Sequence, residues 1–154
     1  MSIIYNSDAT NDWISATVWI RENRPENGWF RAYWEKDGNG VSLEDTGFGL
    51  RFEWEYKDGE RADGISKGWY PNGVLKHTWN WKDKKQVGKY NLWYPNGQKK
   101  IESYFDNGVP KGLATWWYDN GNKMKEYTFV NGKMPDKIRE WNRDGSPKKE
   151  EKKD

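Results

Sequence analysis

Residues 88–111 read GKYNLWYPNGQKKIESYFDNGVPK, and residues 112–135 read GLATWWYDNGNKMKEYTFVNGKMP. The two stretches align over 24 positions without a gap, and each has a Trp-Tyr pair just before an Asn-Gly turn and a second Asn-Gly pair half a period later. The tetrad Tyr-Pro-Asn-Gly also occurs one period earlier, at residues 70–73, and a degenerate copy stands one period later, at residues 142–145. A fixed period of this size is typical of a repeat architecture.

Each copy predicts one β-hairpin. The Asn-Gly pair favours a type I′ turn, in which both central residues have positive φ. Turns about 12 residues apart leave strands of about 6–8 residues, and the residues between the turns are mostly the aromatic and β-branched types that favour strands. The sequence therefore predicts a mainly β protein: an antiparallel β-hairpin repeat array with a 24-residue period, forming a single elongated sheet with little or no helix.

The first half of the chain reads as a leading strand followed by a diverged repeat. Residues 13–20 alternate between two faces, as in a strand. Residues 28–38 resemble the first half of a repeat and residues 52–59 the second half, but the unit is 12 residues longer than the period. The excess lies in the Gly-rich stretch 39–50, which we interpret as an enlarged hairpin loop; such inserts often carry binding residues.

These patterns divide the chain into six parts. We expect a leading β-strand segment at 1–27, a diverged long repeat at 28–63 with its insert at 39–50, regular repeats at 64–87, 88–111 and 112–135, and a degenerate capping repeat with a charged tail at 136–154.

Composition and charge bound the class of protein. The 26 aromatic residues outnumber the 18 Ile, Leu and Val residues, so the rings must supply most of the buried apolar surface. Residues 1–63 carry 7 Lys and Arg against 13 Asp and Glu, whereas residues 64–154 carry 19 against 11, which makes the chain dipolar. With no Cys, no long apolar run and no signal-like start, we expect a cytoplasmic protein that does not cross a membrane.

The repeat resembles a known family. Gly88–Lys111 and Gly112–Pro135 fit the pattern G-x-x-x-x-W-Y-P-N-G-x-x-K-x-E-x-x-F-x-N-G, with some substitutions, and so resemble the MORN-variant repeat of the proteins called YwqK-type antitoxins. The resemblance is clear over residues 64–150 and weak over 28–63. It implies a β-hairpin array that binds other molecules, with toxin neutralisation as one proposed role, and it implies structural roles for the aromatic positions Trp69, Trp93, Trp117 and Trp141.

The sequence offers no catalytic group, metal site or cofactor site. His77 is the single histidine, and we expect it to be a surface or packing residue. Glu102 and Glu126 occupy equivalent positions of neighbouring copies, about 9.5 Å apart for positions two strands apart, which is within the range of a glycosidase pair. We expect them instead to pair across strands with Lys100, Lys123 or Lys125. The interpretation is therefore a protein that is not an enzyme.

The remaining hypothesis is a binding function, for which three classes of partner are possible. Aromatic side chains on an exposed sheet suit a protein partner, and an antitoxin-like or inhibitory role is the most specific form of that hypothesis. Rings interleaved with lysines also suit single-stranded nucleic acid, and ladders of rings suit a glycan. A second copy of the chain is a further possible partner, because it could cover exposed rings. We expect at least half of the rings to serve packing, and the predicted binding residues are Phe48, Trp54, Trp69, Trp79, Trp93 and Trp116.

Overall fold

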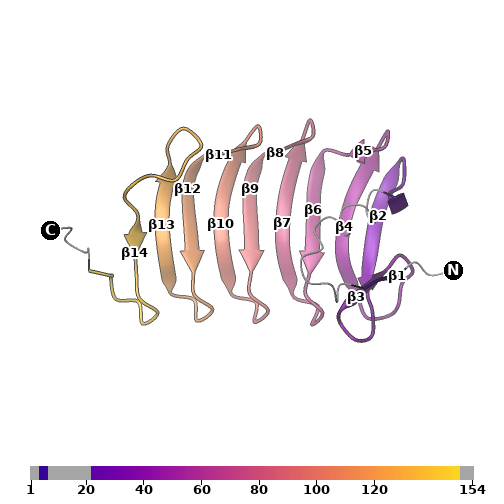
Figure 1. The fold of residues 1–154 in the computed structure, drawn as a ribbon, viewed down its shortest axis with the longest axis horizontal. Helices are drawn as coiled ribbons and strands as arrows, with labels where there is room; N and C mark the ends of the chain where they lie inside the picture. Colours follow the sequence, from indigo (N-terminus) through magenta and orange to yellow (C-terminus); the bar gives the residue numbers. More distant parts are fainter. Residues whose placement is uncertain (1–3, 7–21, 150–154) are drawn as a thin grey trace.

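The computed structural model describes residues 4–6 and 22–149, and these form one open antiparallel sheet (Figure 1). Among these residues only 22–23 are helical, so the predicted fold class is confirmed. The 14 strands of the described residues are β1 (Ile4–Asn6), β2 (Gly28–Trp34), β3 (Gly40–Ser42), β4 (Leu50–Lys57), β5 (Glu60–Arg61), β6 (Gly64–Trp69), β7 (Leu75–Lys82), β8 (Lys85–Gln86), β9 (Gly88–Trp93), β10 (Lys99–Asp106), β11 (Val109–Pro110), β12 (Gly112–Trp117), β13 (Lys123–Phe129) and β14 (Arg139–Glu140).

From β4 onward, each long strand pairs with the next long strand in the sequence. The order across the sheet is β1-β3-β2-β4-β6-β7-β9-β10-β12-β13-β14, and the short strands β5, β8 and β11 pair with the ends of β4, β7 and β10. The strands lie side by side along the long axis of the molecule (Figure 1). The strands β6, β9 and β12 begin at Gly64, Gly88 and Gly112, one 24-residue period apart.

The tetrad turns differ from the prediction. At the tetrads, Gly73 N donates to Tyr70 O over 2.9 Å, and of the tetrad residues only the Gly has positive φ, 82° at Gly73. The prediction of type I′ turns at these positions is wrong, because Tyr70 N pairs with Val74 O and encloses a three-residue loop, which favours a type I turn followed by a Gly with positive φ. The copies with Asp119 and Arg143 in place of Pro have the same form.

The half-period turns are the ones in which two successive residues have positive φ. Asn107 and Gly108 have φ of 50° and 82°, and Asp83 and Lys84 have 48° and 65°. A two-residue hairpin with two positive-φ residues has the type I′ form. These short turns match the right-handed twist of the strands that they join.

The insert 39–50 is more than a loop, because its residues Gly40–Ser42 form β3. This strand lies between β1 and β2, with Val41 paired to Trp34 and Tyr5. Val41 and Ser42 are almost completely buried. The strand predicted at residues 13–20 lies outside the described residues.

The densest core lies in the diverged unit and not in the regular array. Phe30, Ala32, Val41, Trp54 and Tyr56 form a buried cluster from β2, β3 and β4. Phe30 stacks on Trp54 with ring centroids 5.0 Å apart. The array beyond β6 is a single-layer sheet whose neighbouring hairpins stabilise one another.

Specific hydrogen bonds join each tetrad to the next one. The Tyr70, Tyr94 and Tyr118 hydroxyls donate to the carbonyls of Trp93, Trp117 and Trp141 over 2.7, 2.8 and 3.0 Å. The amides of Asn72, Asn96 and Asn120 donate to the carbonyls of residues 95, 119 and 143 over 2.7–2.8 Å. The tetrad at residues 142–145 carries Asn142 and Asp144 in place of the two donors.

Candidate binding surfaces

The strand register separates the side chains into two faces. Residues directly opposite each other in neighbouring strands share a face, and successive residues alternate between faces. His77 is opposite both Gly68 and Leu92, Leu92 is opposite Ile101, and Ile101 is opposite Trp116. These positions and those two residues away on each strand define what we call the ring face.

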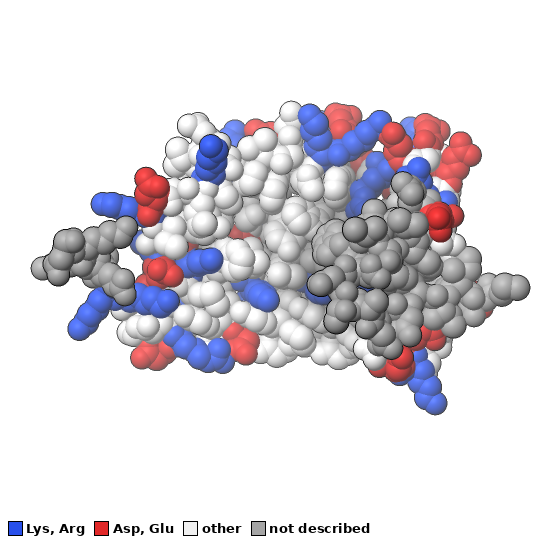
Figure 2. Space-filling view, viewed as in Figure 1, with Lys and Arg blue, Asp and Glu red and all other residues white. Residues whose placement is uncertain are grey.

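The ring face over β6–β13 is mainly aromatic and apolar. Its larger members are half-buried and are Trp79, Trp81, Tyr90, Leu92, Ile101, Phe105, Trp116, Tyr127 and Phe129. Trp79 stacks on Tyr90 with centroids 3.9 Å apart and contacts Phe105 at 5.2 Å. Figure 2 shows a mainly uncharged surface over the middle strands, with a few Lys or Arg side chains within it and more charged side chains towards the margins.

Glycines make room for rings on this face at one end of each hairpin. Trp81, Phe105 and Phe129 lie opposite Gly64, Gly88 and Gly112, as Tyr56 lies opposite Gly28. All four of these glycines have positive φ, which other residues adopt only with strain. The Gly at the start of each repeat is therefore a structural requirement of the hairpin.

The opposite face, which we call the polar face, carries one continuous row of paired polar side chains. From β2 to β14 the row consists of Arg31, Glu53, Lys67, Thr78, Asn91, Glu102, Thr115, Glu126 and Arg139, each opposite the next. Arg31 Nε donates to Glu53 over 2.9 Å, Asn91 donates to Thr78 over 3.1 Å, and Thr115 donates to Glu126 over 3.1 Å.

The two carboxylates considered as a catalytic pair are ion-paired within this row. Lys99 donates to Glu102 over 2.5 Å and Lys123 to Glu126 over 2.8 Å, and Arg139 also binds Glu126. These lysine hydrogen bonds, above all, hold the pKa of both carboxyls below its ordinary value, whereas a general acid needs a raised pKa. Lys123 is one of the expected partners, but it pairs with Glu126 along the same strand and not across strands.

The expected pairing of the two carboxylates with Lys100 and Lys125 is wrong. The Lys100 ammonium lies over the Tyr94 ring at 5.1 Å, and the Lys125 ammonium lies over the Trp116 ring at 4.2 Å. A one-residue register shift in β10 interrupts the alternation of side chains between the two faces at Lys99 and Lys100. Which lysine pairs with Glu102 therefore depends on a bulge that cannot be recognised in the sequence.

His77 is a packing residue, as the sequence predicts. Its ring covers Gly68 so closely that a Cβ on Gly68 would lie 2.4 Å from His77 Cε1. Burial is the largest cause that lowers the pKa of His77, to about 4, with the charges of Lys76 and Arg61 adding to it. The imidazole is therefore neutral at neutral pH.

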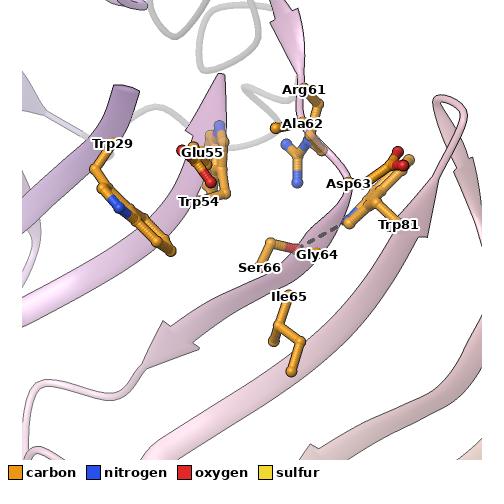
Figure 3. Close-up of a pocket in the computed structure, with 10 residues that line it drawn as sticks. All are labelled: Trp29, Trp54, Glu55, Arg61, Ala62, Asp63, Gly64, Ile65, Ser66 and Trp81. Atoms are coloured by element: carbon orange, nitrogen blue, oxygen red, sulfur yellow. Dashed lines mark hydrogen bonds between the residues drawn. The ribbon is translucent and has the colours of Figure 1, made fainter. Parts of the chain in front are cut away.

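A pocket of about 220 Å³ lies at the junction between the diverged unit and the array, next to β4 and β6. Figure 3 shows Arg61 reaching into the space between Trp54 and Trp81, whose indole N–H donates to Ser66 over 3.0 Å. The guanidinium carbon is 4.3 Å from the Trp54 centroid and 4.6 Å from that of Trp81. Burial lowers the pKa of Arg61 from its ordinary value, but the guanidinium stays charged.

The six predicted binding residues do not share one surface. Trp79 and Trp116 lie on the ring face, and Trp54 lies on the same side but belongs to the core, with 6% of its surface exposed. Trp69 and Trp93 follow Gly68 and Leu92 in their strands and therefore lie on the polar face, half-buried. Phe48 is 49% exposed in the loop before β4.

Sequence reasoning missed Arg61 as a residue of a candidate site. Its equivalents in the next two copies, paired to the same strand positions, are Gln86 and Pro110. A cation where the other copies have none is a break in the repeat pattern, and such a break is the signal that could have identified it.

Among residues 4–6 and 22–149, no group of three or more His, Asp or Glu side chains is placed to hold a metal ion. No helix within the described ranges has the length and apolar character needed to span a bilayer.

Comparison with known proteins agrees with the hairpin periodicity. Residues 62–83, 86–108 and 110–131 each match the family described as MORN repeat variant. No curated protein matches the chain. MORN repeats are generally associated with binding to proteins or to membrane lipids. Three successive segments thus match the MORN repeat variant, and together they form the central part of the sheet.

Proposed function

We propose that the chain is a binding protein without enzymatic activity, and that it recognises a protein partner through the ring face of its repeats. The observation that carries the proposal is the difference between the two faces of one sheet. The ring face presents a row of half-buried rings with few charged residues: Lys125 lies over Trp116, and the bulge lysines Lys76 and Lys100 lie over Tyr70 and Tyr94. The charged groups of the polar face bind each other.

Aromatic side chains that are partly exposed on a rigid support are the usual anchors of protein interfaces. Trp116 supports this reading further, because its indole N–H is buried and has no acceptor. A partner that supplies a carbonyl or carboxylate oxygen there would satisfy the donor as well as cover the ring.

A protein partner fits better than nucleic acid because the basic surface of the array is short and partly engaged. Lys89, Lys99 and Lys123 bind the carboxylates of Glu102 and Glu126 on the polar face. Lys76, Lys100 and Lys125 lie over the rings of Tyr70, Tyr94 and Trp116, as a single-strand track needs. The first 63 residues, however, carry 7 Lys and Arg against 13 Asp and Glu, which opposes a longer track along phosphates.

The more specific form of the proposal is an inhibitory role, like that suggested by the name of the YwqK-type antitoxins. In this form, the ring face covers the functional surface of another protein in the cytoplasm. The expected signature is stoichiometric inhibition of the partner's activity, with no turnover by the chain itself.

The test compares three ligand classes on one preparation of the full chain. A tagged chain is used to capture partners from its native host, beside Trp116→Ala and, as a control on the polar face, Tyr104→Ala. We expect capture that Trp116→Ala loses and Tyr104→Ala retains. Capture that is equal with all three chains would contradict the use of the ring face.

Two further titrations examine the alternatives. Binding of a single-stranded oligonucleotide at low salt that falls steeply at moderate salt would indicate nucleic acid. A shift of Trp fluorescence on titration with polysaccharides would indicate a glycan. Either result, obtained without any protein captured, would overturn the proposal.

A further inference from the structure

We propose that the pocket at the junction of β4 and β6 is a binding site for a single carboxylate carried on a small apolar group, with Arg61 and the indole N–H of Trp54 as its donors. The inference goes beyond the proposed function, because the pocket lies at the junction between the diverged unit and the first regular repeat, away from the rings of β9–β13.

The state of Arg61 is the first observation. Its two flat faces are covered by Trp54 and Trp81, and its guanidinium makes no hydrogen bond or ion pair with the described residues. A guanidinium carries five N–H donors around its edge. With both faces covered by rings, the edge is what an incoming acceptor can reach.

Arg51 shows what a guanidinium with a purely structural role looks like in the same protein. It lies over Trp34 at 4.3 Å and over Phe52 at 5.1 Å, so it contacts two rings as Arg61 does. Its Nη1, however, donates to the carbonyls of Asn39 and Gly40 over 3.2 and 3.4 Å. The contrast indicates that stacking between rings does not explain why the donors of Arg61 lack acceptors.

The indole of Trp54 is the second, independent observation. Trp54 lines the pocket and is only 6% exposed, and its Nε1–H has no acceptor among the described residues. An unpaired buried donor costs about 1–3 kcal/mol. One ligand with two acceptor oxygens would satisfy both unpaired donors, and a carboxylate has that form.

The remaining walls define what the carboxylate is attached to. Trp29, Ala62 and Ile65 supply apolar surface for a small aliphatic group. Glu55 and Asp63 also line the pocket and are exposed. Their two negative charges oppose a dianion such as phosphate and tolerate a monoanion, and they would attract a ligand that also carries an ammonium group. The C-terminal residue of a peptide and a free amino acid both have the required chemistry.

The repeat register shows how this junction differs from the next two. Two residues, Ala62 and Asp63, separate β5 from β6, whereas the single residues Val87 and Lys111 separate the equivalent strands of the next copies. Ala62, Val87 and Lys111 donate the same backbone hydrogen bond to the preceding long strand, so Asp63 is the additional residue. Its carboxylate accepts from Asp83 N over 2.7 Å, which ties the wider junction to the next hairpin.

The experiment titrates the full chain with four probes: N-acetyl-leucine, leucine, N-acetyl-leucinamide and inorganic phosphate. The readout is the set of indole N–H signals in a proton–nitrogen NMR spectrum, with the Trp54 signal assigned from Trp54→Phe. We expect N-acetyl-leucine to shift the Trp54 signal downfield and the amide and phosphate to leave it in place. Arg61→Gln, which introduces the residue of the next copy, should weaken binding by about 10- to 100-fold.

Arg51→Gln is the matched control, and it should bind N-acetyl-leucine as the unchanged chain does. If Arg61→Gln does not fold, Arg61→Lys keeps the charge between the rings and loses the two-pronged geometry, so it should also bind more weakly. Leucine binding more tightly than N-acetyl-leucine would support the site and identify a free amino acid, and equal binding would support it and identify a peptide terminus. Equal shifts with N-acetyl-leucine and its amide, or unchanged affinity in a folded Arg61 variant, would overturn the proposal. Neither result depends on whether the ring face binds a protein.

Discussion

The pair Gly68 and His77 shows how a single position of the repeat is adjusted locally. In the next copies the same opposed pair is Leu92 with Ile101 and Trp116 with Lys125. Gly68 therefore stands where the other copies have a large side chain, and the imidazole fills the space that this leaves. Gly68 is not among the glycines with positive φ, so contact and not backbone strain explains its identity.

Gly68→Ala should destabilise the protein by about 1–3 kcal/mol, as overpacking does in a tight contact. The new Cβ would meet the His77 ring, and the ring would have to move. Chemical denaturation measures the free energy of unfolding. Gly68→Ala combined with His77→Ser should recover most of the loss, and a double variant no better than the single one would show that the contact is not the cause.

His77 also makes stability depend on pH. Its folded-state pKa of about 4 lies below the ordinary 6.5, so at pH between these values the unfolded chain binds a proton that the folded chain does not. The contribution of this group is present above pH 6.5 and is lost as the pH falls towards 4. Between pH 7.5 and pH 5 the loss should be about 2 kcal/mol.

The measurement is the free energy of unfolding at the two pH values, for the chain and for His77→Gln. Gln does not titrate, so the variant should be nearly insensitive to pH over this interval. A variant that keeps the full pH dependence would assign it to other groups.

The tetrads act at the level of the hairpin, where they join each turn to the next. Removing one hydroxyl by Tyr94→Phe takes away the donor to Trp117 O and should cost about 1 kcal/mol. The matched control is Tyr104→Phe. The Tyr104 hydroxyl donates to the carboxylate of Glu102 over 3.2 Å in an exposed part of the polar face. We expect the midpoint of thermal unfolding to fall in Tyr94→Phe and to change hardly at all in Tyr104→Phe. Equal shifts of the midpoint would show that the tetrad hydrogen bond stabilises the protein no more than the exposed one.

The hairpins could be predicted from the sequence because period, strand composition and turn residues all agree within each copy. The turn types could not be assigned correctly at the tetrads, since the Asn-Gly pair fits both a two-residue type I′ loop and the three-residue loop that the structure has. The hydrogen bonds from Tyr70 and Asn72 to the next turn could not be foreseen either, because they depend on how far apart successive hairpins lie in space.

The candidate site was predicted less well than the fold. The face of each Trp depends on the strand register, which the sequence does not give. Trp69 and Trp93 were therefore grouped with Trp79 and Trp116 although they lie on the opposite face. Trp54 was expected at the surface because it follows the insert, but its strand lies over the core with Phe30 and Tyr56. An aromatic residue in the sequence is compatible with a buried or an exposed position, and only the strand register distinguishes the two.

The molecule as a whole is dense at one end and a single layer at the other. The buried cluster lies in β2, β3 and β4, whereas each later hairpin contacts only its neighbours in the sheet. In arrays of this kind stability is nearly a sum of repeat and neighbour terms, so local opening should become easier towards the short edge strand β14.

Amide hydrogen exchange tests this gradient. Amides of β2 and β4 should exchange most slowly, those of β9 and β10 at intermediate rates, and those of β13 and β14 fastest. Uniform protection from β4 to β13 would show instead that the array unfolds as one cooperative unit.

The function proposed for the whole molecule depends on the two faces being used differently. Tyr127 on the ring face and Tyr104 on the polar face are the same residue type in neighbouring hairpins, and each is at least partly exposed. The most direct measurement replaces each in turn by the photo-crosslinking residue p-benzoylphenylalanine in the full chain and irradiates cells of the native host. A protein crosslinked from position 127 and not from position 104 is the expected result, whereas crosslinks from 104 alone, or none from 127, would contradict binding through the ring face.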